Sequence, residues 1–228
     1  MTLPKPFYQD DYATIYHGDC REILPLLPKV DLVLTDPQYG IGRCAGMGGG
    51  GFDSTGRYRR TPKTYAGGWD KEPPTDGEIR AVIGAGRSAI IWGANYFGLK
   101  GGKWLVWNKE QVMPSYSDAE LAWTNLPGDS VKMFTFGCNR ARVEQGLHPT
   151  QKPVALMIWC LGFGSFKLVC DPYLGSGTSL VAAKMKGIQA IGIEREQSYC
   201  EIAANRLRNE SNPLIVEQQS THSQQNLI

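Results

Sequence analysis

The chain has 228 residues, of which 42% are hydrophobic and 20% charged, and its formal net charge is +2. This length and mixture predict one soluble globular domain and exclude two large ones. So small a net charge decides nothing about nucleic acid, and any DNA affinity must come from local clusters of Lys and Arg. No apolar run approaches the roughly 20 residues that a membrane-spanning helix needs, so we expect no membrane partner.

The six cysteines are widely spaced and include no CxxC pair. Secreted small domains are usually rich in disulfides, whereas zinc sites usually carry closely paired cysteines. We find no signal peptide ahead of them. The pattern therefore predicts a cytoplasmic protein with reduced thiols and no metal site.

The first half of the chain begins with an α/β pattern. Strands are expected at 12–16 and 30–35, with helical spacing over 20–27 between them. Strands so rich in Val, Leu and Ile are typical of buried parallel strands covered by helices. From about 40 to 74 the pattern gives way to glycines, single aromatics and mainly basic charges, which indicates a long loop insertion. Long loops in compact domains are usually functional or disordered.

Regular structure resumes with a helix over 76–85. Strands are expected next at 88–92, 103–107, 119–124 and 131–136. Their close spacing implies an antiparallel portion at one sheet edge. Helices at 153–161, 178–186 and 196–208 then alternate with strands at 167–170 and 190–193. We therefore predict a mostly parallel α/β fold with helices on both faces, formed by one domain over 1–210, and a polar, disordered tail over 211–228.

A glycine turn follows the strand expected at 167–170. Residues 171–178 read D-P-Y-L-G-S-G-T, and the glycines would let a ligand approach the backbone and the N-terminus of the next helix. Glu194 stands at the tip of the following strand, where a carboxylate can accept hydrogen bonds from ribose hydroxyls. The turn alone fits an ordinary strand-to-helix connection equally well, and it lacks the third glycine of the dinucleotide motif. Together with Glu194 it predicts a nucleoside-cofactor site.

A second motif follows the strand at 30–35. Asp36-Pro37-Gln38-Tyr39 places a carboxylate, a constrained carbonyl and an aromatic ring at the carboxyl edge of the sheet, where open α/β folds bind ligands. Taken alone, an Asp-Pro turn more often only ends a strand. The glycine turn and Glu194 make a functional interpretation stronger.

These motifs resemble those of the amino-methyltransferases of bacterial and phage DNA, over about residues 12–208. That family carries Asp/Asn/Ser-Pro-Pro-aromatic as its catalytic motif and Asp-Pro-Phe-x-Gly-x-Gly-Thr as its cofactor motif. Here the catalytic motif comes first, which resembles the permuted order often called beta. The resemblance implies a Rossmann-like class I methyltransferase fold. Gln38 replaces the second proline, which leaves the Pro37 carbonyl in place but reduces the rigidity of the loop.

The resemblance also implies S-adenosylmethionine as cofactor, double-stranded DNA as partner and, as in many permuted members, a homodimer. His148-Pro149-Thr150-Gln151-Lys152-Pro153 is similar to a family segment that contacts the methionine end of the cofactor. Asp19 would lie near the adenine ring of the cofactor, although its simpler role is to cap a helix that begins at Cys20. The implied cofactor residues are Asp19, Cys20, Asp36, Thr150, Lys152, Asp171, Pro172, Gly175, Ser176, Gly177, Thr178, Glu194 and Arg195.

Three tryptophan-containing segments, 92–97, 107–109 and 120–123, are similar to segments of the smaller phage-type members. Without that resemblance we would assign these tryptophans to the core.

The implied catalytic residues are Asp36, Pro37 and Tyr39. The Asp36 carboxylate and the Pro37 carbonyl can accept the two N–H groups of an exocyclic amine, while Tyr39 stacks on a flipped base. The leading Asp favours adenine N6. Cytosine N4, a base in RNA, or a binding module that has lost catalysis remain alternatives. Cytosine C5 chemistry is disfavoured because the chain has no Pro-Cys nucleophile.

We expect no recognition domain of the size found in larger family members. We therefore expect the loop over 40–74 to bind DNA, although an exposed and flexible basic loop would have the same composition. The residues expected to meet phosphates or base edges are Arg43, Arg57, Arg59, Arg60 and Lys63.

Overall fold

The computed structural model describes residues 2–39, 73–110, 117–128, 130–137 and 151–210, together with the backbone of 50–52 and 58–60. Arg43, Arg57, Lys63 and Thr150 lie outside these residues, as does the tail expected over 211–228. Arg59 and Arg60 are described by their backbone alone. The roles expected of them remain predictions.

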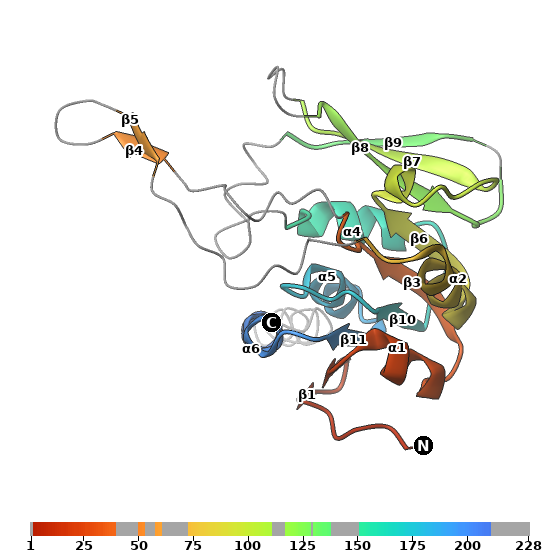
Figure 1. Ribbon diagram of the computed structural model, residues 1–228, viewed down its shortest axis with the longest axis vertical. Helices are drawn as coiled ribbons and strands as arrows, with labels where there is room; N and C mark the ends of the chain where they lie inside the picture. Colours follow the sequence, from red (N-terminus) through yellow and green to blue (C-terminus); the bar gives the residue numbers. More distant parts are fainter. Residues whose placement is uncertain are drawn as a thin grey trace, which may run out of the picture.

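A nine-stranded sheet forms the centre of the described part, in the order β1-β2-β11-β10-β3-β6-β8-β7-β9 (Figure 1). Its strands are β1 (Tyr8–Gln9), β2 (Ala13–His17), β3 (Val30–Thr35), β6 (Gly86–Trp92), β7 (Lys103–Asn108), β8 (Ala119–Thr124), β9 (Lys132–Thr135), β10 (Leu168–Asp171) and β11 (Gln189–Glu194). The five strands from β2 to β6 in this order run parallel. β8 runs antiparallel to both β6 and β7, which confirms the antiparallel portion expected at one edge.

Three details of the strands differ from the sequence-based expectation. The short strand β1 pairs antiparallel with β2 at the opposite edge. β6 begins at Gly86, directly after the preceding helix. Within the loop expected to be irregular, β4 (Gly50–Phe52) and β5 (Tyr58–Arg60) form a separate antiparallel pair. These short strands have too few alternating residues to be recognised by periodicity.

The helices are α1 (Cys20–Ile23), α2 (Asp76–Ala85), α4 (Val154–Leu161), α5 (Thr178–Met185) and α6 (Gln197–Asn209), with 3-10 turns η1 (Leu24–Leu26) and η2 (Ala94–Tyr96). The helix expected over 20–27 therefore ends at Ile23 and continues as η1. Pro25 lies in the first turn of η1, and its missing N–H prevents the α-helical hydrogen bonds from continuing. In the part of the chain that the structure describes, no helix is long and apolar enough to cross a membrane.

Helices cover both faces of the sheet, as predicted. Leu32 and Leu34 of β3 belong to the core shared with α4, α5 and α6. Val33, pointing the opposite way, packs in the core shared with α1 and α2 through residues such as Ile79 and Val82. Successive strand residues point to opposite faces, so each face of β3 contributes to a different apolar layer. Figure 1 shows α5 and α2 on opposite sides of the sheet.

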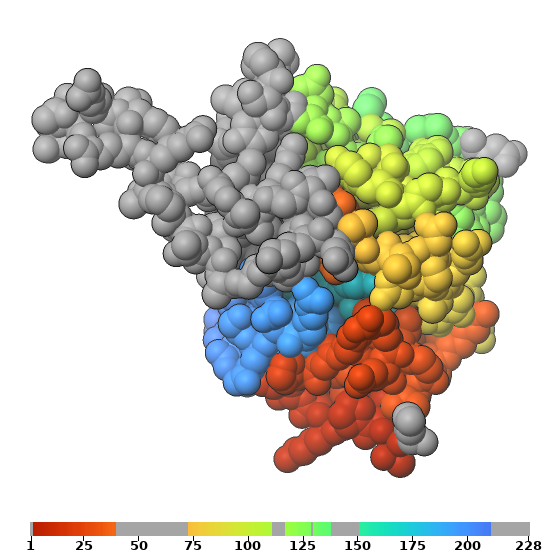
Figure 2. All heavy atoms as spheres, in the orientation of Figure 1, coloured from red at the N-terminus to blue at the C-terminus, as the bar shows by residue number. Residues whose placement is uncertain are grey.

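The chain leaves the centre of the sheet in two directions. From β10 it passes through α5 to β11 on one side, whereas from β3 it continues to β6 on the other. The carboxyl ends of β3 and β10 therefore flank a topological switch point, the usual ligand site of open α/β sheets. Pairing of β11 with β2 brings the two ends of the described chain together, and Figure 2 shows the N-terminal segment beside α6.

Leu34→Ala tests the importance of the central layer. Leu34 is fully buried, so removing its side chain should leave a cavity and lower the free energy of unfolding by about 2–5 kcal/mol. Urea titration followed by circular dichroism measures this change. Val131→Ala is the control, since Val131 is 61% exposed and its loss should change stability by less than about 0.5 kcal/mol. Equal losses in both variants would contradict the assignment of the core.

Candidate active site

The buried carboxylate of Asp171 joins the two central strands at the switch point. Thr35, the last residue of β3, donates its hydroxyl to Asp171 Oδ1 at 2.6 Å, and the Tyr173 N–H donates to the same oxygen at 3.1 Å. The Ser179 hydroxyl of α5 donates to Oδ2. Burial raises the pKa of Asp171 to about 6 even though these hydrogen bonds favour its charged form. Asp171 thus connects β3, β10 and the start of α5.

The glycine turn after β10 is fixed by residues from outside it. Gly177 has φ of +84°, and a Cβ there would lie 2.7 Å from Ala203 Cβ of α6, so the turn and α6 pack too closely for a side chain. Arg206 of α6 donates to the Ser176 carbonyl at 2.7 Å and to Thr178 Oγ1 at 3.0 Å. The guanidinium therefore holds the turn on both sides of Gly177.

Glu194, at the end of β11, faces the same turn. Its Oε2 accepts the Gly175 N–H at 2.8 Å, and its Oε1 accepts the Glu196 N–H at 2.9 Å. Burial raises the pKa of Glu194, while these two N–H donors work in the opposite direction. Each carboxylate oxygen has a second lone pair. Because the side chain is only partly buried, hydroxyl donors of a ligand could reach it.

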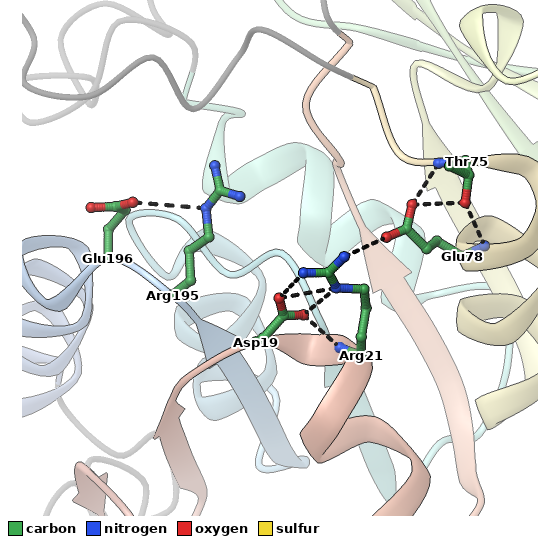
Figure 3. Close-up of polar contacts among 6 residues, drawn as sticks. All are labelled: Asp19, Arg21, Thr75, Glu78, Arg195 and Glu196. Carbon is green, nitrogen blue, oxygen red and sulfur yellow. Dashed lines mark hydrogen bonds and ion pairs between the residues drawn. The ribbon is translucent and has the colours of Figure 1, made fainter.

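Asp19 lies at the neighbouring edge of the sheet and caps α1. Its Oδ1 accepts the Arg21 N–H at 2.8 Å, and the Arg21 guanidinium binds the carboxylate from the side (Figure 3). The Arg21 hydrogen bond lowers the pKa of Asp19. Arg21 also approaches Glu78 of α2 at 3.5 Å. The simpler capping role is therefore present, and the expected position near an adenine ring remains a prediction.

Two more residues of the implied cofactor set lie near this edge. Arg195 follows β11, is exposed, and pairs with Glu196 at 3.7 Å (Figure 3). Cys20 is partly buried, and burial raises the pKa of its thiol. Pro172 is buried within that turn.

The second motif lies directly after β3. Tyr39 donates its hydroxyl to Asp36 Oδ1, so the two side chains predicted to act on a base contact each other. The Asp36 side chain is 24% exposed, which leaves it open to a substrate, whereas Pro37 is buried. Burial raises the pKa of Asp36, and the nearby Lys152 ammonium opposes that rise.

The ring of Tyr39 lies between a glycine and a second tyrosine. It stacks on Tyr96 of η2 with a centroid distance of 4.9 Å and an interplanar angle of 17°. Gly93 has φ of +68°, and a Cβ there would lie only 1.9 Å from Tyr39 Cε1. The segment from Trp92 to Phe97 thus does more than fill the core, because Gly93 leaves space for the tyrosine ring and Tyr96 covers it. Tyr96 is 47% exposed, so this stack reaches the surface.

The segment before α4 connects the two motifs. Gln151 Oε1 accepts the Ser176 hydroxyl of the glycine turn at 3.1 Å. The next residue, Lys152, donates to Asp36 Oδ2 at 2.5 Å and to the Tyr39 hydroxyl at 3.2 Å. Lys152 was expected beside the methionine end of a cofactor. The structure shows its ammonium in contact with the catalytic motif, and the expected cofactor contact remains a prediction.

A second carboxylate lies on the other side of Lys152. Glu120 Oε2 is 3.0 Å from Lys152 Nζ, and Glu120 Oε1 is 2.5 Å from Lys109 Nζ. Burial works to raise the pKa of Glu120, but the two ammonium groups outweigh it and lower the pKa to about 2. From the sequence, the segments that contain Glu120 and Lys109 were notable only for their similarity to phage-type members. Neither residue was expected in a site.

The structure thus brings most of the described site residues to one edge of the sheet. Residues that contact that set and were not predicted from the sequence include Thr35, Ser179, Arg206 and Glu120, and Glu120 in turn pairs with Lys109. The polar Thr35, which ends β3 after three apolar residues, was the one local signal among them. Arg206 lies 30 residues along the chain from Ser176, and Glu120 belongs to a different segment from Lys152, so no local spacing rule connects these pairs.

Comparisons with known proteins agree with these motifs. Residues 128–205 match the family model for N6/N4 methyltransferases, described as DNA methylase. The Type II methyltransferase M.ScaI of Streptomyces caespitosus is 27% identical over 271 aligned residues, which cover 93% of this chain and 87% of that protein.

Two solved structures are similar in fold. The M1.HpyAVI–SAM complex matches with a TM-score of 0.55 and 22% identity, covering 86% of this chain and 98% of the other. The PvuII DNA methyltransferase, described as cytosine-N4-specific, matches with a TM-score of 0.58 and 15% identity, covering 93% of each chain.

The fold is therefore that of class I methyltransferases, with a mostly parallel sheet and an antiparallel edge. The family match and the relative support the similarity to DNA amino-methyltransferases of restriction–modification type that the motifs had indicated.

Asp171→Asn tests the electrostatic state of the buried carboxyl. Because burial raises the pKa of Asp171 to about 6, its stabilising contribution is complete below about pH 4 and is lost as the pH rises through about 6. Asparagine keeps an oxygen for Thr35 and Tyr173 but does not titrate. Between pH 4 and 7 the parent should lose stability relative to the variant, by on the order of 3 kcal/mol. Urea titrations across this range measure it, and parallel curves for the two proteins would refute the raised pKa.

Proposed function

We propose that this protein transfers a methyl group from S-adenosylmethionine to an exocyclic amino group of a base in double-stranded DNA, with adenine N6 as the favoured target. The observation that carries this proposal is the position of Asp36. Its partly exposed carboxylate lies at the end of β3, beside the glycine turn and Glu194 that end the next two strands of the sheet. The groups that can accept hydrogen bonds from an amine and the site for a nucleoside thus lie at the same edge of the sheet.

The residues of the turn fit a nucleoside cofactor. Glu194 presents carboxylate oxygens that already accept one N–H each and can accept ribose hydroxyls in addition. Gly175 has φ of +53°, and apart from its chain neighbours no described residue has an atom within 4 Å of the place where a Cβ would be, so on this side its backbone is open to a ligand. When bound, S-adenosylmethionine supplies a methyl group activated by its sulfonium. The similarity in fold to M1.HpyAVI, whose solved structure is a complex with SAM, supports this assignment.

Asp36 and Pro37 supply the groups that an aromatic amine needs. The lone pair of an exocyclic amine is delocalised into the ring, which makes it a poor nucleophile. A carboxylate oxygen of Asp36 and the carbonyl of Pro37 can accept its two N–H groups, favour a tetrahedral nitrogen and stabilise the positive charge that develops there. Preorganised groups of this kind contribute a few kcal/mol each, on the order of 3. Alignment of the methyl donor with the attacking nitrogen lowers the barrier further, and no covalent enzyme intermediate is needed.

Tyr39 and Tyr96 provide an aromatic surface for the base. A base in a duplex must be extruded before reaction, at a cost of a few kcal/mol that stacking in the pocket offsets in part. The Tyr39 hydroxyl is held by Asp36 and its ring is backed by Gly93. Because Tyr96 stacks on the Tyr39 ring in this structure, a flipped base that stacks on Tyr39 would take the place of Tyr96, with its amino group close to the Asp36 carboxylate.

Adenine N6 is the favoured target because the motif begins with Asp. Cytosine N4 is the alternative, and the similarity in fold to a DNA methyltransferase described as cytosine-N4-specific favours keeping it. The name of the relative M.ScaI, a Type II methyltransferase, suggests a role in restriction–modification. The basic loop over 40–74 remains the proposed DNA contact, and a homodimer remains a proposal from the family resemblance.

Analysis of modified nucleosides tests this function directly. Purified protein is incubated with S-adenosylmethionine and unmethylated plasmid DNA, and the digested DNA is separated by liquid chromatography with mass detection. We expect N6-methyladenine from the parent and none from Asp36→Ala, which loses the acceptor of the amine. If the digested DNA contains N4-methylcytosine and no N6-methyladenine, the target is cytosine N4 and not adenine N6. Methylation by Asp36→Ala near the parent rate would refute the catalytic role of that carboxylate.

Glu194→Ala tests the cofactor half alone. The change removes the proposed ribose acceptor and the hydrogen bonds to the Gly175 and Glu196 N–H groups. We expect the affinity for S-adenosylmethionine to fall at least about tenfold, equivalent to ~1.4 kcal/mol, as measured by isothermal titration calorimetry. Glu201→Ala, an exposed change on α6, should bind like the parent. Unchanged affinity in Glu194→Ala would place the ribose elsewhere.

A further inference from the structure

Four charged side chains of alternating sign form a row that ends at the catalytic motif. Lys109 of β7 pairs with Glu120 at 2.5 Å, and Glu120 of β8 lies 3.0 Å from Lys152. Lys152, just before α4, pairs with Asp36 at 2.5 Å. The row thus connects the antiparallel edge of the sheet to its centre, and its formal charges sum to zero.

The burial of this row makes its charge balance important. The side chain of Lys152 is 6% exposed and that of Lys109 is 11% exposed, so neither ammonium is well solvated. Charges removed from water need partners, and loss of one partner leaves the other poorly compensated. Lys152 has a carboxylate on each side. Without Glu120, the Lys152 ammonium would be paired with the Asp36 carboxylate alone.

The proposed reaction sets a clear requirement for this balance. The sulfonium of the methyl donor is a cation, and the attacking nitrogen becomes positive during transfer. A row with no net charge leaves Asp36 able to stabilise that positive charge. A row with one excess positive charge would oppose both the donor and the transition state, and the effect is strong where water is excluded.

We propose that Glu120 is a positioning residue that holds Lys152 between two carboxylates, so that Lys152 orients Asp36 without cancelling its charge, while Lys109 balances Glu120. This inference rests on the proposed methyl transfer and deepens it. It assigns a function to two residues, Lys109 and Glu120, that lie outside both sequence motifs.

The pKa directions agree with this arrangement. Burial works against the charge of Lys152, but Asp36 and Glu120 together hold its pKa well above the usual value. Among the described residues, the groups that influence Asp36 include Lys152 and Glu120 from neighbouring elements, Tyr39 from the same loop, and Asp171 at the end of the adjacent strand β10. The negative charge of Glu120 is among the factors that raise the pKa of Asp36. Its removal should therefore lower that pKa.

The experiment compares single-turnover methyl transfer by the parent, Glu120→Gln, Lys109→Met and the double variant that carries both changes. Glu120→Gln gives the row an excess positive charge, so its rate should fall about tenfold or more, with the acid limb of its pH–rate profile displaced to lower pH. The double variant returns the row to zero net charge. The double variant should transfer the methyl group at least about threefold faster than Glu120→Gln. Two independent sites would not show this energetic coupling between the substitutions.

Two measurements separate this role from a purely structural one. Calorimetry with S-adenosylhomocysteine, whose sulfur carries no positive charge, should give affinities within about twofold of the parent for all variants, because the cofactor turn is unchanged. Carboxyl-carbon NMR titration should show a lower pKa for Asp36 in Glu120→Gln than in the parent. A structural role alone predicts no such shift and a double variant that is worse than either single one.

The outcomes distinguish this inference from the proposed function. If the parent transfers no methyl group to DNA, the proposed function fails and the inference fails with it. If the parent is active and Glu120→Gln keeps its rate and pH profile, only the inference is overturned. A folded double variant that is slower than Glu120→Gln also overturns it. Should Glu120→Gln fail to fold, the charge-balanced double variant decides, and a rate near that of the parent supports the inference.

Discussion

The site depends on the parallel pairing of β3 with β10 at the point where the chain turns in opposite directions across the sheet. This pairing places Asp36 and the glycine turn at one edge. Asp171 holds the two strand ends together through Thr35, and it remains buried because the hydroxyl and N–H donors around it replace water. A ligand bound at this edge would contact groups whose relative positions are set by buried hydrogen bonds.

Residues 151 and 152 provide a second connection between the two halves. Gln151 accepts a hydrogen bond from the glycine turn, and Lys152 binds the carboxylate and the tyrosine of the catalytic motif. A shift of this short segment would therefore move both motifs together. Glu120 and Lys109 extend the connection to β8 and β7, so the antiparallel edge contributes charge to the centre of the site as well as apolar packing.

The motifs were recognisable because each is formed by consecutive residues. Asp36 to Tyr39 and Asp171 to Thr178 follow strands that their Val, Leu and Ile content identifies, and strand ends meet at one sheet edge by geometry. Element boundaries were less predictable. Pro25 shortened α1 through its missing N–H, and β1 is only two residues long, too short for an alternating pattern.

The sequence by itself determined the α/β class, the order of the two motifs and the position of Asp36 and Glu194 at strand ends, because periodicity and local turn chemistry are properties of neighbouring residues. Only the tertiary structure decided which side chains surround them. Lys152 contacts Asp36 across 116 residues of sequence, and Arg206 of α6 holds the glycine turn from 30 residues away. Such contacts depend on strand order and helix packing, and burial then makes the balance of their charges matter. No local pattern carries that information.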